Sequence, residues 1–90
     1  MSLSIEKEFD RIFRGEQVIS KEEQDLLRQS MLFMLDDREL GLAADVLMVW
    51  SCKITGVIEF MEDLGKINDS QEEDLMMILN AIEAGECTAA

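Results

Sequence analysis

Residues 20–35 read SKEEQDLLRQSMLFML, and this stretch decides the class of fold. Its first four residues form a capping box, in which the side chains of Ser20 and Glu23 each accept a hydrogen bond from the other's backbone N–H. Behind the box, residues 31–35 are apolar on every side of a helix, which is typical of a helix that crosses the centre of a fold. The sequence therefore predicts a central helix over residues 20–35.

Similar signals bound a first and a last helix. The first is expected to run from its N-cap at Ser4 to about Phe13. The last is expected to follow the capping residues 68–70 and to end at Gly85, which leaves residues 86–90 as a flexible tail. One apolar stripe on the last helix is predicted to face the core: Leu75, Ile78, Leu79 and Ile82.

The middle of the chain predicts a third helical unit. Asp36, Asp37 and Glu39 are expected to open it, because carboxylates favour the positive end of a helix dipole. Apolar side chains then recur in steps of four and three over residues 43–64, a spacing that suits one continuous helix. The pair Thr55-Gly56 is a weak helix former in the middle of this unit, so the sequence slightly favours a bend there.

Length and composition support one small helical domain. The chain has 90 residues, of which 48% are hydrophobic, enough for one core and too many for a disordered segment. We therefore expect an all-α fold, a compact bundle of four to five short helices over residues 1–85.

The charge is strongly unbalanced. Twenty acidic residues oppose eight basic ones and give a net charge of −12. Direct binding of nucleic acid is not expected, because such binding needs cations that neutralise phosphates. An anionic membrane would also repel this surface, and no apolar run approaches the ~18–20 residues of a membrane span. With no recognisable signal peptide, the composition indicates a cytoplasmic protein.

Catalytic chemistry is not expected from these residues. The chain has no His, which removes the commonest general base and a common metal ligand. Cys52 and Cys87 form no CxxC pair and are expected to be free thiols. The acids crowd the predicted helix starts without a calcium-binding or glycine-rich loop. We therefore predict a protein that is not an enzyme and that uses no cofactor or metal.

Two features could bind a partner protein. The excess of acids would speed the encounter with a basic partner, although a solvated surface without a specific role explains it equally well. Met77 lies opposite the stripe that faces the core, so it is expected to be exposed or in an interface. The candidate partner-binding residues are Asp36, Asp37, Glu39, Glu72, Glu73, Asp74 and Met77.

One segment resembles a known family. Residues 38–47, RELGLAADVL, resemble the G-E-x-G-L-A-x-x-x-L pattern of small bacterial immunity proteins of the Maf and contact-dependent-inhibition type. Residues 67–72 loosely resemble the I-S-x-x-E cap that opens the final helix of that family. The resemblance covers about a third of the chain and departs at Arg38, where the family has Gly. It implies a helical protein that binds and neutralises a cognate toxin domain.

The charge and the resemblance favour the same function. We expect inhibition of a basic partner, either a toxin domain or a nucleic-acid-binding protein. Two alternatives stay open. The chain could mimic nucleic acid and inhibit a DNA-binding or defence protein. It could also be a small helical adaptor or secretion chaperone that holds a partner helix in an apolar groove and forms a homodimer.

Overall fold

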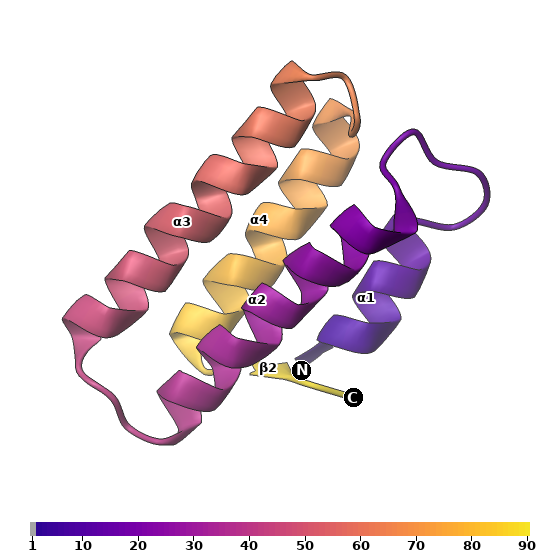
Figure 1. The fold of residues 1–90 in the computed structure, drawn as a ribbon. Coiled ribbons are helices and arrows are strands. Elements are labelled where there is room, and N and C mark those ends of the chain that lie inside the picture. The colour runs from indigo at the N-terminus through magenta and orange to yellow at the C-terminus, as the bar shows by residue number, and fades with distance from the viewer. Residues whose placement is uncertain (1) are drawn as a thin grey trace.

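The computed structural model describes residues 2–90, so residue 1, where the predicted domain begins, lies outside it. In this range the chain forms four helices, α1 (Ile5–Ile12), α2 (Lys21–Glu39), α3 (Ala44–Asp63) and α4 (Asp69–Ala84). Figure 1 shows α2 and α3 side by side and antiparallel, with α4 behind them and α1 beside the start of α2. The predicted all-α bundle is confirmed. None of the described helices is long and apolar enough to cross a membrane.

Local capping chemistry fixes where the helices begin. At α2 the Ser20 hydroxyl accepts from the Glu23 N–H at 3.1 Å, and the Glu23 carboxylate accepts from the Ser20 N–H at 2.9 Å. At α4 the side chains of Asn68 and Gln71 make the same reciprocal pair at 2.8 and 3.0 Å. These bonds satisfy backbone donors that the first helical turn leaves without partners. Both predicted helix starts, and the cap of α1 at Ser4, are confirmed.

The prediction that Asp36, Asp37 and Glu39 open a third helix is wrong. α2 continues through all three residues and ends at Glu39. The stop is Gly41, whose φ of +74° lets the Leu42 N–H donate to the Asp37 carbonyl at 3.1 Å. Glycine adopts this left-handed conformation without a Cβ clash, so it is a strong signal for the end of a helix. This signal outweighs the preference of the three carboxylates for the start of a helix. The acids therefore lie at the negative end of the α2 dipole.

The predicted bend at Thr55-Gly56 is also wrong, because α3 is one continuous helix of 20 residues. On either side of Gly56, Ile54 and Ile58 are almost fully buried in the core. Burying side chains of this size stabilises by about 1.5–3 kcal/mol each, which exceeds the cost of about 1 kcal/mol for a glycine within a helix. Packing on both flanks therefore keeps the helix intact.

The core is organised around α4, which contacts each of the other three helices. All four residues of its predicted stripe are buried: Leu75, Ile78, Leu79 and Ile82. They belong to one core cluster with buried side chains of α1, α2 and α3, among them Ile58 and Met61 of α3. The helix ends at Gly85, as predicted, with a φ of +75°.

Residues 86–90 differ from the flexible tail that the sequence predicts. Strand β2 (Cys87–Thr88) pairs in parallel with strand β1 (Leu3–Ser4), and the Cys87 side chain is buried. The Leu3 N–H also donates to the Glu86 carbonyl at 2.9 Å. This pairing joins the two ends of the chain, as Figure 1 shows. No local sequence pattern predicts it.

Candidate functional site

The acidic residues expected to bind a partner form two separate groups. Asp36, Asp37 and Glu39 lie at the end of α2, where the neighbouring Arg38 side chain donates to the Glu83 carbonyl near the end of α4. The other group lies in the first turns of α4. Along α4 alone, residues 74 and 83 are about 14 Å apart. The structure therefore does not bring the two groups into one patch.

Two of these acids have partners inside the chain. The Trp50 indole Nε1 donates to the Asp37 carboxylate at 2.6 Å, which ties α3 to α2. Arg11 of α1 forms an ion pair with Asp74 at 3.2 Å, which ties α1 to α4. Asp36, Glu39 and Glu73, by contrast, are exposed and are the candidates best placed to meet a partner.

Glu72 belongs to a cluster of carboxyl groups where α3 meets α4. Hydrogen bonding to Asp69 first, then burial and hydrogen bonding to Glu72, raise the pKa of Glu62 to about 7. A raised pKa means that the protonated form is favoured by folding, so this stabilisation is present at low pH and is lost as pH rises through 7. No group of three His, Cys, Asp or Glu side chains in residues 2–90 is placed to hold a metal ion.

Half of the eight cations are already ion-paired within the chain. Arg11, Lys21, Arg28 and Lys66 each form an ion pair with a carboxylate. The Lys66 ammonium lies 2.8 Å from both oxygens of Glu23, and this hydrogen bond is the main reason why the pKa of Glu23 falls to about 2. The acids left over therefore carry the net negative field.

Met77 is exposed, as the sequence predicts. Its side chain is 58% exposed on α4 and borders a shallow hollow with Asn80 and Ala81. The remaining lining comes from Leu3, Ala84 and Glu86 at the two ends of the chain. Among the described residues, Met77 is thus the single large exposed apolar side chain of α4.

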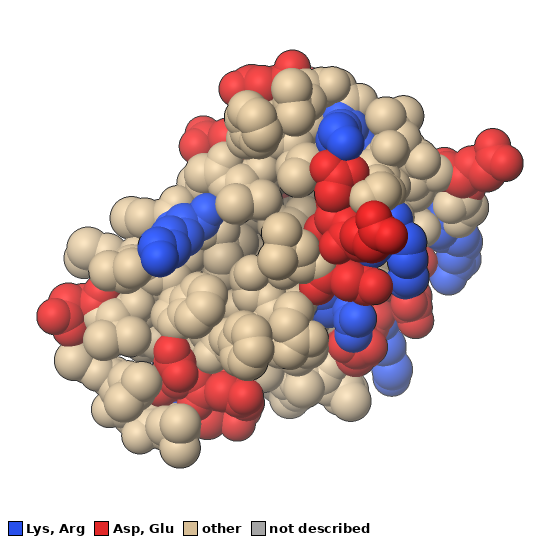
Figure 2. All heavy atoms as spheres, in the orientation of Figure 1, with Lys and Arg blue, Asp and Glu red and all other residues tan. Residues whose placement is uncertain are grey.

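A much larger apolar surface covers α2 and α3. We call it the α2–α3 face and define it by nine side chains: Leu26, Phe33 and Leu40 on α2, and Val46, Val49, Trp50, Val57, Phe60 and Leu64 on α3. Seven of the nine are exposed, while Trp50 and Val57 are half-buried. Figure 2 shows the face as a broad region without charge, interrupted by one basic side chain and bordered by acids. Exposed apolar surfaces of this extent, rimmed by polar residues, mark interaction sites.

Sequence reasoning missed this face. The apolar run over residues 31–35 predicts burial on every side, yet Phe33 is 50% exposed. The available signal was a second stripe with a spacing of seven: Leu26, Phe33 and Leu40 on α2 lie beside the buried stripe instead of within it. On α3, Trp50 and Val57 follow the predicted seven-residue rhythm but lie at the edge of the core.

Comparison with known proteins gives no relative. No family model matches the chain, and neither a curated protein nor a solved structure is significantly similar to it. The resemblance of residues 38–47 to immunity proteins therefore gains no support from these comparisons. In the structure, those residues form the last turn of α2, the turn at Gly41 and the start of α3.

Proposed function

We propose that this chain is a non-catalytic binding protein that inhibits a basic partner protein. The observation that carries the proposal is the α2–α3 face, an exposed apolar surface with unpaired acids at its border. Protein interfaces commonly combine an apolar centre with a polar rim. The acidic rim would attract a cationic partner, and the apolar centre would hold it once bound.

Within this class we propose a toxin-immunity role. A toxin that attacks nucleic acid needs a cationic cleft, and an acidic protein that covers such a cleft blocks it. The resemblance in residues 38–47 agrees with this role. Immunity would require only tight binding, so the excess of acids and the apolar face suffice for it.

A helical adaptor is the second candidate, and the same apolar face favours it, because an adaptor would use that surface to hold a partner helix. A nucleic-acid mimic is less well supported. It would present carboxylates along one continuous surface, whereas here Asp36 and Glu39 lie at the end of α2, apart from the acids in the first turns of α4.

A pull-down from the lysate of the native host, at low and high salt, tests the proposal. We expect a stoichiometric basic protein that is released at high salt and whose activity the purified chain inhibits. The double variant Asp36→Lys, Glu39→Lys should weaken its capture. The control Asp10→Lys, Glu16→Lys changes the net charge equally at exposed positions of α1 and the loop that follows it, and should weaken capture less. Recovery of no inhibited partner would contradict the proposal.

A further inference from the structure

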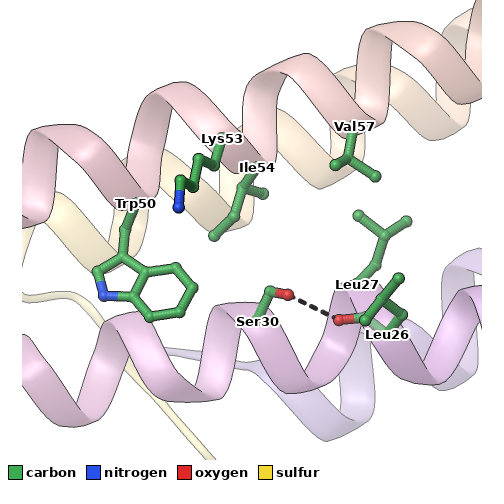
Figure 3. A pocket seen from close by; sticks show the side chains of 7 residues that line it. All are labelled: Leu26, Leu27, Ser30, Trp50, Lys53, Ile54 and Val57. Atoms are coloured by element: carbon green, nitrogen blue, oxygen red, sulfur yellow. Dashed lines mark hydrogen bonds between the residues drawn. The ribbon is translucent and has the colours of Figure 1, made fainter.

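A groove runs between α2 and α3 within the α2–α3 face. It encloses about 230 Å³ and is lined by Leu26, Leu27 and Ser30 from α2 and by Trp50, Lys53, Ile54 and Val57 from α3. Figure 3 shows these side chains converging from both helices on the same space. The Ser30 hydroxyl is turned back to its own helix, where it donates to the Leu26 carbonyl at 2.9 Å. The groove is therefore almost wholly apolar.

The walls of the groove are held in place from within the chain. Phe33 and Trp50 stack with their ring centroids 6.2 Å apart, and Asp37, one turn further along α2, accepts a hydrogen bond from the indole Nε1 of Trp50. Both flanking helices are 19 to 20 residues long, so the face extends for about 28–30 Å. A partner helix of about 18–20 residues would match this length.

Charge along the groove is arranged in three zones. Lys53 lies in the middle, and no residue in 2–90 forms an ion pair with it. One end carries Asp36, Glu39 and Asp45, which are all exposed. The other end carries Glu22 and Asp63, while the nearby cations Lys21 and Lys66 are paired with carboxylates of α2.

We propose that an amphipathic helix of the cationic partner lies in this groove, with Lys or Arg at both of its ends and an acidic residue near its middle, opposite Lys53. The apolar stripe of that helix packs along the groove and against exposed side chains of the α2–α3 face such as Phe33 and Phe60. The inference rests on the proposed function and adds to it the bound element, its charge pattern and its register.

The charges argue against a second copy of the chain as the occupant. Both ends of the α2–α3 face are acidic, so parallel and antiparallel pairing would each bring acids against acids. Each copy also carries a net charge of −12. Close like charges across an interface repel each other strongly, so a helix with basic ends fits where a second copy does not.

Two designed peptides of 20 residues test the inference by calorimetric titration. Both carry a leucine stripe with basic first and last turns, and they differ only in a central Glu or a central Lys. Long-range attraction to an acidic protein favours the peptide with central Lys. The groove predicts the opposite: the peptide with central Glu should bind about five-fold more tightly, the effect expected of one partly exposed ion pair.

Variants of the protein complete the test. Lys53→Glu should reverse the preference between the two peptides. Phe33→Glu should weaken binding of both peptides at least ten-fold, whereas Met48→Glu, the same change at an exposed apolar residue of α3 outside the α2–α3 face, should leave both unchanged. Far-UV circular dichroism of each variant checks that the helices are intact.

Three results would overturn the inference: no binding of either peptide, the same preference after Lys53→Glu, or a wild-type dimer in sedimentation that Phe33→Glu dissociates. Experiments with the basic partner from the host distinguish failure of this inference from failure of the proposed function. If Phe33→Glu still captures and inhibits the basic partner, the groove is not the site although the chain is an inhibitor. If no such partner exists, the inhibitor proposal fails regardless of the peptides.

Discussion

The two sides of this bundle are held together by different means. On the α1 side, long-range polar contacts join the helices: Arg28 pairs with Glu6 at 2.9 Å, and Gln71 of α4 donates to the Ile12 carbonyl at 3.1 Å. On the α2–α3 side, the Trp50–Asp37 hydrogen bond joins the two helices and the Lys66–Glu23 ion pair holds the segment after α3 against α2. Between these two polar links the contact is apolar. The first side satisfies its own polar groups, whereas the second leaves apolar surface for another molecule. The long-range polar contacts of the α1 side and the apolar surface proposed to bind the partner therefore lie on different sides of the bundle.

The largest effect is expected where the α2–α3 side meets the core. Ile58→Ala removes a fully buried side chain of α3 and should lower the free energy of unfolding by about 2–5 kcal/mol. Val49→Ala on the exposed part of the same helix should change it by less than about 0.5 kcal/mol. Urea denaturation measures both. Equal losses would mean that the α2–α3 face is itself part of the core.

On the α1 side, Gln71 is the polar residue with the most partners. Its side chain accepts from the Asn68 N–H and donates both to the Ile12 carbonyl and to Gln17 at 2.8 Å. Gln71→Ala should cost about 1–2 kcal/mol of unfolding free energy, since it leaves partly buried acceptors unpaired. The control Gln29→Ala is on the exposed surface of α2 and should be neutral. If Gln71→Ala leaves the free energy of unfolding unchanged, polar contacts do not stabilise the α1 side in the way that the comparison of the two sides requires.

The α2–α3 side should gain from a cap that it lacks. Ala43 is the N-cap of α3, with extended backbone angles and no side-chain hydrogen bond. Ala43→Ser should raise the free energy of unfolding by about 0.5–1 kcal/mol, because the hydroxyl can accept from an unpaired N–H of the first turn. Thermal unfolding measures the gain, and Ala89→Ser is a control outside the helices. If Ala43→Ser lowers the free energy of unfolding instead, the hydroxyl does not cap the first turn of α3.

The smallest effect concerns Glu62, on the border between α3 and α4. Its raised pKa means that stability should decrease as pH rises from about 5 to 8. Glu62→Gln should raise the melting temperature by a few degrees at pH 8 and leave it unchanged at pH 5. The opposite dependence of stability on pH is expected for Glu23. Because folding lowers the pKa of Glu23 to about 2, its contribution to stability is lost as the pH falls from 4.5 toward 2. A Glu62→Gln gain that is equal at both pH values would contradict this assignment.

The sequence predicts those parts of the fold that depend on neighbouring residues. The boxes at Ser20 and Asn68 act within four residues, so their patterns can be recognised directly. The acids at residues 36–39 were misplaced because carboxylates also occur within helices, and the decisive signal was the glycine that follows them. The bend expected at Gly56 failed because the burial of Ile54 and Ile58 depends on α2 and α4.

The candidate site was less predictable than the fold, because the exposure of a side chain depends on how all the helices pack together. An apolar run such as residues 31–35 predicts burial, but only the position of α3 shows that Phe33 is left half exposed. The pairing of Asp37 with Trp50 and of Asp74 with Arg11 joins residues that are 13 and 63 positions apart. Charge counting therefore identified an acidic protein without identifying which acids are free to act.

The position of Trp50 makes the groove optically observable. The chain has one tryptophan and no tyrosine, so emission excited at the long-wavelength edge of protein absorption arises from this single indole. That indole is half-buried, stacked on Phe33 and hydrogen-bonded to Asp37. A molecule that enters the groove displaces water from around this indole and shifts its emission. The protein therefore carries an intrinsic fluorophore in the wall of the groove, and no label is needed to follow its occupancy.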